Sequence, residues 1–210
     1  MTNFKPLLSE VLRPQTLADL NLPENISSSL DRMVKSGSAM NLLFYGKPGI
    51  GKTSTARILI NELRADVYEL NGSFNNGDKT MVRVIESFAS TMSLSDGPKI
   101  CFIDEADHMS TDVQASLRYV IERVSSNTRF LLTANDISKL TPAMKSRCLP
   151  ICFDVPPHQF RDVVDRMTLR YEQRLNELGY TTDTKRIREI VAYYFPDLRT
   201  IANMFQLELN

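Results

Sequence analysis

The sequence has no tryptophan, few cysteines and no excess of charge of either sign. Its 210 residues include 25 basic and 25 acidic side chains, so the formal net charge is zero. A chain without a global charge excess has no basic tail for nucleic acid, and any DNA contact must therefore be local. The three cysteines, Cys101, Cys148 and Cys152, are odd in number and form no Cys-x-x-Cys pair. Neither a disulfide framework nor a zinc site is indicated.

Long apolar runs are also lacking. The longest, such as residues 100–103 and 130–132, fall far below the roughly 20 residues that cross a bilayer. The N-terminus, Met1 to Pro6, lacks the apolar core of a signal peptide. We therefore expect a protein that is not secreted and has no membrane partner. Its expected location is the cytosol of a bacterium or infected host cell, or the nucleus if the source is eukaryotic.

The most informative motif that is present is a phosphate-binding loop. The segment Gly46-Lys47-Pro48-Gly49-Ile50-Gly51-Lys52-Thr53 follows a strand-like run and precedes a helix-like segment that begins at Ser54. The glycines let the backbone wrap a polyphosphate, and free amides at the helix start point toward it. We expect the Lys52 ammonium to neutralise the β- and γ-phosphates of ATP and the Thr53 hydroxyl to ligate Mg²⁺.

Polar side chains follow two further strand-like runs. Ile100 to Ile103 leads directly into Asp104-Glu105-Ala106-Asp107, and Leu131-Leu132-Thr133-Ala134 leads into Asn135. Ligand-binding side chains lie where buried parallel strands end. We expect Asp104 to hold Mg²⁺ through its water shell and Glu105 to polarise the water that attacks the γ-phosphate. Asn135 would orient the same water or touch the γ-phosphate.

The order of the apolar runs predicts an α/β fold: a five-stranded parallel sheet flanked by helices, followed by a small all-helical domain. The expected strands are residues 41–45, 66–70, 99–103, 129–133 and 150–155. The expected helices around them are residues 53–63, 79–92, 111–124 and 137–145. After Pro156-Pro157, apolar residues recur at helical spacing up to Gly179, and segments 183–194 and 198–209 follow. We therefore expect a nucleotide-binding domain at residues 1–155 and a helical lid domain at 156–210.

Two arginines are candidates for the charge that phosphoryl transfer needs at its transition state. Arg147 lies in Ser146-Arg147-Cys148, immediately before the fifth strand, and Arg199 starts the last helix. Taken singly, either residue could equally be a solvated surface side chain.

Together these motifs resemble the AAA+ ATPases, and the Ser-Arg-Cys triplet resembles their clamp-loader branch. Asn71-Gly72-Ser73 looks like the second-strand motif of that branch, and Glu10 to Pro14 looks like its N-terminal box, with Arg13-Pro14 against the adenine. The resemblance covers essentially the whole chain and is strongest to replication factor C small subunits and phage clamp-loader ATPase subunits. It implies that Arg147 is an arginine finger acting on a neighbour's ATP and that Arg199 is the lid's sensor of bound nucleotide. The residues that the resemblance places against DNA are Lys79, Thr80 and Arg83.

The resemblance implies a subunit of a pentameric spiral that opens a sliding clamp with ATP and Mg²⁺ and places it on primer-template DNA. Three departures bear on this. The family usually has Lys-Tyr where this chain has Val11-Leu12. Such subunits normally continue into a collar domain, whereas this sequence ends at Asn210 with the lid, so we expect a truncated chain or assembly by another route. The four-cysteine zinc module of bacterial loaders is missing, which favours the phage or the archaeal and eukaryotic branches.

Three alternatives remain. Asp104-Glu105-Ala106-Asp107 also reads as the motif of a DEAD-box RNA helicase, but a helicase core needs two such domains. Another AAA+ machine, such as an origin-binding or branch-migration ATPase, usually appends a winged-helix module. A non-catalytic scaffold that uses ATP only to assemble would have no chemical need of Glu105 or Arg147. Turnover stimulated by DNA and clamp distinguishes an active loader from a scaffold.

Overall fold

The computed structural model describes residues 7–20, 22–74, 80–93 and 96–209, which form two compact units. We call residues 16–47 with 52–153 the sheet unit. The helical unit comprises the segment up to Gln15, residues 48–51 at the tip of the phosphate-binding loop, and the chain from Asp154 onward. The division into domains at residue 155 stays a prediction.

The sheet unit alternates strands and helices, as expected for a parallel sheet. Its strands are β1 (Leu42–Tyr45), β2 (Asp66–Asn71), β3 (Lys99–Asp104), β4 (Thr128–Ala134) and β5 (Leu149–Cys152). Its α-helices are α2 (Glu24–Ser36), α3 (Lys52–Glu62), α4 (Thr80–Ser90), α5 (Thr111–Arg123) and α6 (Pro142–Lys145). Short 3₁₀ helices are η1 (Leu17–Asp19), η2 (Ala106–His108) and η3 (Ile137–Lys139).

All strand pairs are parallel, and the strand order is β2-β3-β4-β1-β5. The register aligns Leu42 with Leu131 and with Leu149, and Lys99 with Thr128. The predicted fold class is therefore confirmed. Because every strand runs in the same direction, the carboxyl ends of β1, β3 and β4 share one edge of the sheet, and their amino ends share the other.

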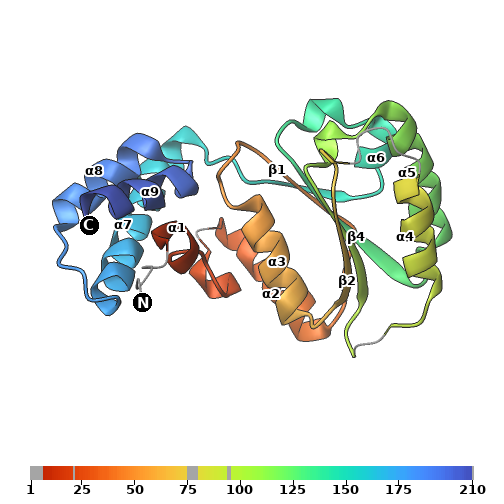
Figure 1. Ribbon diagram of the computed structural model, residues 1–210, viewed down its shortest axis with the longest axis horizontal. Coiled ribbons are helices and arrows are strands. Elements are labelled where there is room, and N and C mark those ends of the chain that lie inside the picture. Colours follow the sequence, from red (N-terminus) through yellow and green to blue (C-terminus); the bar gives the residue numbers. More distant parts are fainter. Residues whose placement is uncertain (1–6, 21, 75–79, 94–95, 210) are drawn as a thin grey trace, which may run out of the picture. The chain divides into compact units, whose positions relative to one another are not determined.

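Helices cover both faces of the sheet, with α2 and α3 on one side and α4 and α5 on the other (Figure 1). Successive side chains of each strand point to opposite faces. Leu43, Cys101, Phe130 and Leu132 belong to the core beneath α4 and α5, together with Ile85 and Leu117 from those helices. Cys101, in the middle of β3, is fully buried, and burial raises the pKa of its thiol. Both faces of the central strands are apolar because both faces are covered.

Three of the differences between the structure and the predicted elements concern the sheet unit directly. Helix α2 was not predicted, although Ile26, Leu30 and Met33 have helical spacing and Leu30 and Met33 are buried. The helix expected at 137–145 is instead η3 followed by the single turn α6, which starts at Pro142 with Thr141 as its N-cap. Strand β5 ends at Cys152 and not at residue 155.

Lys99, the first residue of β3, is a buried cation in the sheet unit. Its side chain is 2% exposed, and its ammonium donates to the carbonyls of Phe88 and Thr91, each at 2.6 Å. The ammonium also lies 4.4 Å from the centre of the Phe88 ring. Phe88 lies in the last turn of α4 and Thr91 follows the helix, so the ammonium lies at the C-terminal end of α4, where a positive charge is favourable. Lys99 therefore joins the start of β3 to the end of α4.

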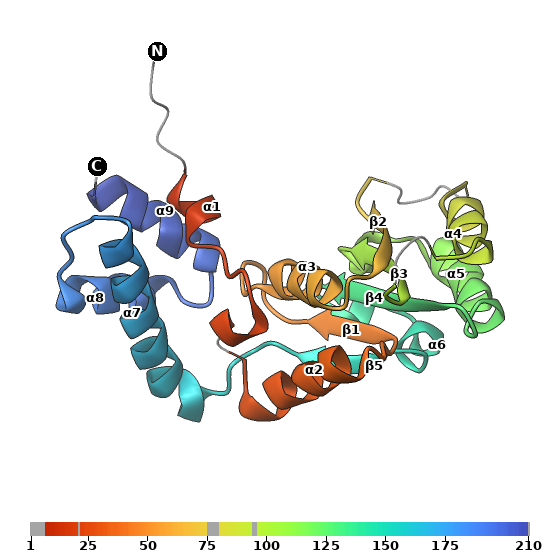
Figure 2. The ribbon, with the colours of Figure 1, turned by 90° about the horizontal axis from the view of Figure 1, so that it is seen from below.

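The helical unit contains α1 (Leu8–Val11), α7 (Phe160–Glu177), α8 (Thr184–Tyr194) and α9 (Leu198–Glu208), and the 3₁₀ helix η4 (Pro157–Gln159). Figure 2 shows these helices from a second direction. Leu8 and Leu12 of the N-terminal segment share a core with Val164, Tyr171 and Phe205. Among the described residues, no helix has the length and apolar character needed to span a membrane.

Candidate nucleotide site

The phosphate-binding loop connects the end of β1 at Tyr45 to the start of α3 at Lys52. Gly49 and Gly51 have φ values of +77° and +103°, a conformation that residues with a side chain rarely adopt. The Lys52 ammonium donates to the carbonyls of Gly46 at 2.8 Å and Lys47 at 2.9 Å, and to Asn135 Oδ1 at 2.8 Å. The side chain is 6% exposed. The structure therefore brings together Lys52 and Asn135, which are 83 residues apart in the sequence.

The two residues expected to bind Mg²⁺ are in direct contact. The Thr53 hydroxyl lies 2.9 Å from Asp104 Oδ1 and 3.2 Å from Oδ2. Among the described residues, no group of three or more His, Cys, Asp or Glu side chains forms a metal cluster. One hydroxyl and one carboxylate form the sparse oxygen set with which proteins hold Mg²⁺ when nucleotide phosphates and water supply the other ligands. These two residues therefore fit Mg²⁺ bound together with a nucleotide.

Glu105 adopts a left-handed backbone conformation immediately after β3, with φ 54° and ψ 45°. Its backbone amide donates to the Thr133 hydroxyl at 2.9 Å, and its carboxylate accepts a hydrogen bond from the Ser73 hydroxyl. A Cβ atom at Gly72 would lie 2.5 Å from the Glu105 carbonyl oxygen. Glycine is therefore needed in Asn71-Gly72-Ser73 because the chain passes so close to Glu105. The sequence did not predict this contact between Ser73 and Glu105.

Arg147 lies at the opposite edge of the sheet from these residues. It precedes β5, and its carbonyl accepts from the Asn41 side chain at 3.2 Å, next to the amino end of β1. Its Nη1 donates to the Ala143 carbonyl at 2.8 Å, and its Nη2 is bonded to the Glu122 carboxylate on α5. Cys148 is buried in the sheet-unit core, and burial raises the pKa of its thiol to about 12.

The remaining candidates lie in the helical unit or on α4. Within the helical unit, the Leu198 amide donates to the Gly49 carbonyl at 3.1 Å, and the exposed Arg199 follows in the first turn of α9. Arg13 pairs with Glu10 at 3.3 Å and is followed by Pro14. Thr80 and Arg83 are exposed in the first turn of α4, whereas Lys79 lies outside the described residues.

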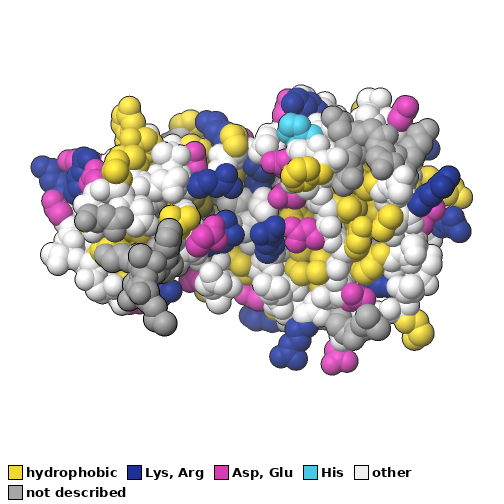
Figure 3. All heavy atoms as spheres, viewed as in Figure 1, with side chains coloured by type: hydrophobic (Ala, Val, Ile, Leu, Met, Phe, Trp, Pro, Cys, Tyr) yellow, Lys and Arg dark blue, Asp and Glu magenta, His cyan; other side chains and the backbone are white. Residues whose placement is uncertain are grey.

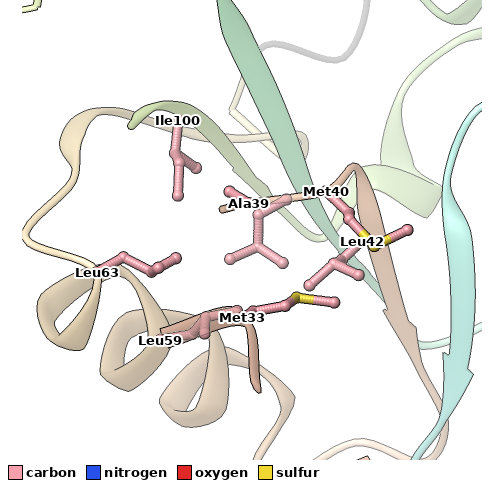
Figure 4. Close-up of a pocket in the computed structure, with 8 residues that line it drawn as sticks. Met33, Ala39, Met40, Leu42, Leu59, Leu63 and Ile100 are labelled. Atoms are coloured by element: carbon pink, nitrogen blue, oxygen red, sulfur yellow. The ribbon is translucent and has the colours of Figure 1, made fainter. Parts of the chain in front are cut away.

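Neither the surface charge nor the apolar hollow in the sheet unit indicates a further ligand-binding site. On the face in Figure 3, basic and acidic side chains are intermixed and form no extended surface of one sign. A small apolar hollow lies between α2, α3 and the sheet, with Met33, Leu59 and Ile100 among its lining residues (Figure 4). This hollow has no polar group that could orient a ligand, so we regard it as imperfect core packing.

Residues 42–154 match the model of the AAA family, described as the ATPase family associated with various cellular activities. This segment is more than half of the chain. The chain belongs to the AAA ATPase family. This AAA ATPase chain is 36% identical over 204 residues to replication factor C subunit 5 of Mus musculus, which covers 94% of the chain and 58% of the mouse protein. It is 35% identical to replication factor C small subunit 2 of Pyrobaculum islandicum, and the match covers 94% of this chain and 62% of the Pyrobaculum protein. The chain thus spans about three fifths of the length of these relatives.

Solved structures share the fold of this AAA ATPase chain at lower sequence identity. The Holliday junction branch migration motor RuvB of Thermotoga maritima superposes with a TM-score of 0.67 at 17% identity, covering 95% of this chain and 70% of RuvB. The ORC1 protein of Aeropyrum pernix, solved in complex with DNA, gives a TM-score of 0.64 at 19% identity, covering 95% and 62%. At such identities the likeness shows the fold alone.

Proposed function

We propose that the chain is an ATPase subunit of a sliding-clamp loader, which hydrolyses ATP in an assembly with other subunits to place a clamp on primer-template DNA. Two curated relatives at 35–36% identity carry the name replication factor C, and they support this choice among AAA functions. The observation that carries the proposal is the division of catalytic groups between the two edges of the sheet. Asp104 ends β3, Asn135 follows β4 and Lys52 follows the loop after β1, whereas Arg147 precedes β5.

At the carboxyl edge we assign ATP binding to Lys52 and the loop residues Gly46 to Ser54, and activation of the attacking water to Glu105. Asn135 would orient that water or touch the γ-phosphate. Thr53 and Asp104 would hold Mg²⁺, which when bound supplies charge neutralisation for the β- and γ-phosphates. The Ser73 hydroxyl donates a hydrogen bond to the Glu105 carboxylate. This bond uses one carboxylate oxygen, Oε2, so the second oxygen of Glu105 can accept the proton of the attacking water while Ser73 orients the side chain.

Arg147 is assigned to the γ-phosphate of a neighbouring subunit. The strands between the two edges have four to seven residues. At about 3.3 Å per residue they separate the edges by more than roughly 13 Å, which an arginine side chain cannot span. Its own nucleotide is therefore out of reach, and an arginine finger supplied in trans is a known solution for phosphoryl transfer. This requirement for a neighbour supports assembly into a ring or a pentameric spiral.

The other assignments follow from the family resemblance. Arg199 would sense the nucleotide from the lid domain at 156–210, and Arg13-Pro14 would lie against the adenine. Lys79, Thr80 and Arg83 would face DNA phosphates. Thr80 and Arg83 lie in the first turn of α4, where the helix dipole adds to the positive potential. We place the protein in a phage, archaeal or eukaryotic replication system, and so in the infected host's cytosol, the archaeal cytosol or the nucleus.

The proposal is tested by ATP hydrolysis of the chain, alone and assembled with the companion subunits and clamp of its own source, with and without primer-template DNA. We expect slow turnover by the isolated chain and stimulation by clamp and DNA together. Lys52→Ala should abolish the melting shift caused by ATP and Mg²⁺. Glu105→Gln should keep that shift and slow hydrolysis by orders of magnitude, since an amide cannot accept the proton. Glu189→Gln, in the helical unit, is the matched control and should change neither.

Two outcomes would contradict the proposal. An assembled complex that binds ATP but shows no stimulated turnover would instead be a nucleotide-dependent scaffold. If Lys52→Ala still shows a normal ATP-dependent shift in melting temperature, the phosphate-binding loop does not bind ATP. The likeness to ORC1 and RuvB does not support origin binding or branch migration as the function. Sequence identities below 20% are evidence for a shared fold alone.

A further inference from the structure

Asp107, the last acid of Asp104-Glu105-Ala106-Asp107, is buried and points away from bulk solvent. It lies in η2 with 5% of its surface exposed. Its Oδ2 accepts a hydrogen bond from the backbone amide of Asp136 at 3.1 Å. We propose that Asp107 is a positioning residue, which fixes the turn after β4 and thereby holds the Asn135 side chain in place beside Lys52.

Asn135 is held from both sides by the acidic segment. Two residues before it, the Thr133 hydroxyl donates to the Asp104 carboxylate and accepts from the Glu105 amide at 2.9 Å. One residue after it, the Asp136 amide donates to Asp107. The ends of β3 and β4 are therefore joined by hydrogen bonds on each side of Asn135. With its Oδ1 accepting from Lys52, the Asn135 amide nitrogen remains as a donor for a phosphate or a water.

The contact that Asp107 makes with the Asp136 amide requires a hydrogen-bond acceptor and does not require a negative charge. Its Oδ1 is buried and has no hydrogen-bond partner among the described residues. In the part of the chain that the structure describes, no cationic side chain is bonded to Asp107, so Oδ2 alone makes the positioning contact and Oδ1 is unsatisfied. An asparagine has the same shape and keeps a carbonyl oxygen for the Asp136 amide. A neutral amide also costs less to bury than a carboxylate. The geometry thus requires an acceptor at this position and not an acid.

This inference rests on the proposed role of Asn135 in ATP hydrolysis, and it makes a sharp distinction between two variants. Asp107→Ala removes the acceptor and should lower kcat by between about tenfold and a hundredfold, as small displacements of catalytic groups do, with ATP affinity nearly unchanged. Asp107→Asn should keep turnover within about twofold of the wild type. A metal-binding or proton-transferring acid would give the opposite result, because its asparagine variant loses the charge.

The experiment measures kcat and ATP affinity for the assembled complex with the chain carrying Asp107→Ala, Asp107→Asn, Asn135→Ala, or Asp107→Ala with Asn135→Ala. If Asp107 acts through Asn135, the double variant should be no slower than Asn135→Ala alone. Additive losses would overturn the proposal, as would a loss of more than tenfold in folded Asp107→Asn. The asparagine variant decides the question by itself if Asp107→Ala does not fold.

Hydrogen exchange of the isolated chain gives a readout that does not depend on activity. The Asp136 amide should exchange faster in Asp107→Ala and at the wild-type rate in Asp107→Asn. Thr133→Val, which cuts the connection on the other side of Asn135, is the matched control and should leave the Asp136 amide protected. An unchanged Asp136 amide in Asp107→Ala would overturn the positioning role. A complex that does not hydrolyse ATP would refute the proposed function, while the exchange rates would still decide whether Asp107 holds the turn.

Discussion

The guanidinium of Arg147 is bonded to the carboxylate of Glu122, 25 residues earlier in the chain. Arg147 retains 25% of its side-chain exposure and Glu122 retains 54%, so the pair lies at the surface of the sheet unit. The Nη2 atom of Arg147 is therefore already bonded within its own chain. If Arg147 acts on a neighbour's nucleotide as proposed, that nucleotide must displace Glu122, and bidentate binding of phosphate by arginine is strong enough to compete with an exposed ion pair.

The pair has a defined dependence on pH. Donation from Arg147 lowers the pKa of Glu122 below its ordinary value. The pair therefore stabilises the fold above the ordinary glutamate pKa, and this contribution is lost as the pH falls through the lowered value. We expect carboxyl-carbon NMR of Glu122 to titrate below an ordinary glutamate, and to return to the ordinary range in Arg147→Ala. An unchanged midpoint in that variant would mean that the pair does not form in solution.

Arg147→Ala should leave ATP binding intact and suppress turnover only in the assembled complex, because we assign its guanidinium to the nucleotide of the adjacent subunit. Mixing Arg147→Ala chains with Lys52→Ala chains should restore part of the activity, since some interfaces then pair an intact loop with an intact finger. Arg123→Ala, which removes a nearby arginine paired with Glu86, is the matched control and should not affect turnover. No recovery at any mixing ratio, with assembly verified, would count against action in trans.

Gly72→Ala should impair hydrolysis by displacing Glu105. The added methyl would meet the Glu105 carbonyl at 2.5 Å, and backbone atoms cannot yield as a flexible side chain can. Overpacking of this kind costs about 1–3 kcal/mol in unfolding free energy. Turnover should fall more than ATP affinity does. Gly37→Ala provides the comparison, because its backbone is left-handed but its Cβ would meet nothing within 4 Å. Gly37→Ala should lower the melting temperature without changing kcat, and equal losses of kcat in both variants would exclude the contact as the cause.

Lys79→Glu with Arg83→Glu should weaken primer-template binding and DNA-stimulated hydrolysis while basal turnover stays the same. Contacts to phosphates alone predict an effect independent of sequence. Losing two of them should lower the slope of log affinity against log salt by roughly 2 per engaged subunit. Arg32→Glu with Lys35→Glu on α2 makes the same charge change elsewhere and should not alter the slope. If the slope of the first double variant equals that of the wild type, the DNA does not pass along α4.

The sequence alone predicts the sheet and the identity of its principal polar side chains. Apolar runs that lead directly into Gly46, Asp104 and Asn135 determine which residues reach the carboxyl edge, because the direction of a parallel strand fixes its end. Lys52 meets Asn135, and Thr53 meets Asp104, because all four residues lie at this carboxyl edge of the sheet. Helix α2 could also have been found, since Ile26, Leu30 and Met33 repeat at helical spacing.

The connections that hold these side chains were not predictable in the same way. Ser73 with Glu105, Asp107 with Asp136, and Glu122 with Arg147 are each separated by 25 to 32 residues. Each depends on loop conformation and on the register between neighbouring elements, which hydrophobic periodicity does not specify. Single serine, aspartate and glutamate residues in loops or on helix surfaces are also common without any such role. The sequence thus reveals the reacting groups more readily than the residues that position them.

The burial of Lys99 makes strand β3 and helix α4 a single mechanical element. If α4 tilted by itself, the ammonium would lose the Phe88 and Thr91 carbonyls and remain in an apolar interior without partners, at a cost of several kcal/mol. We therefore expect the end of α4 and the start of β3 to move together. Asp104, whose carboxylate contacts Thr53, is the last residue of the same strand.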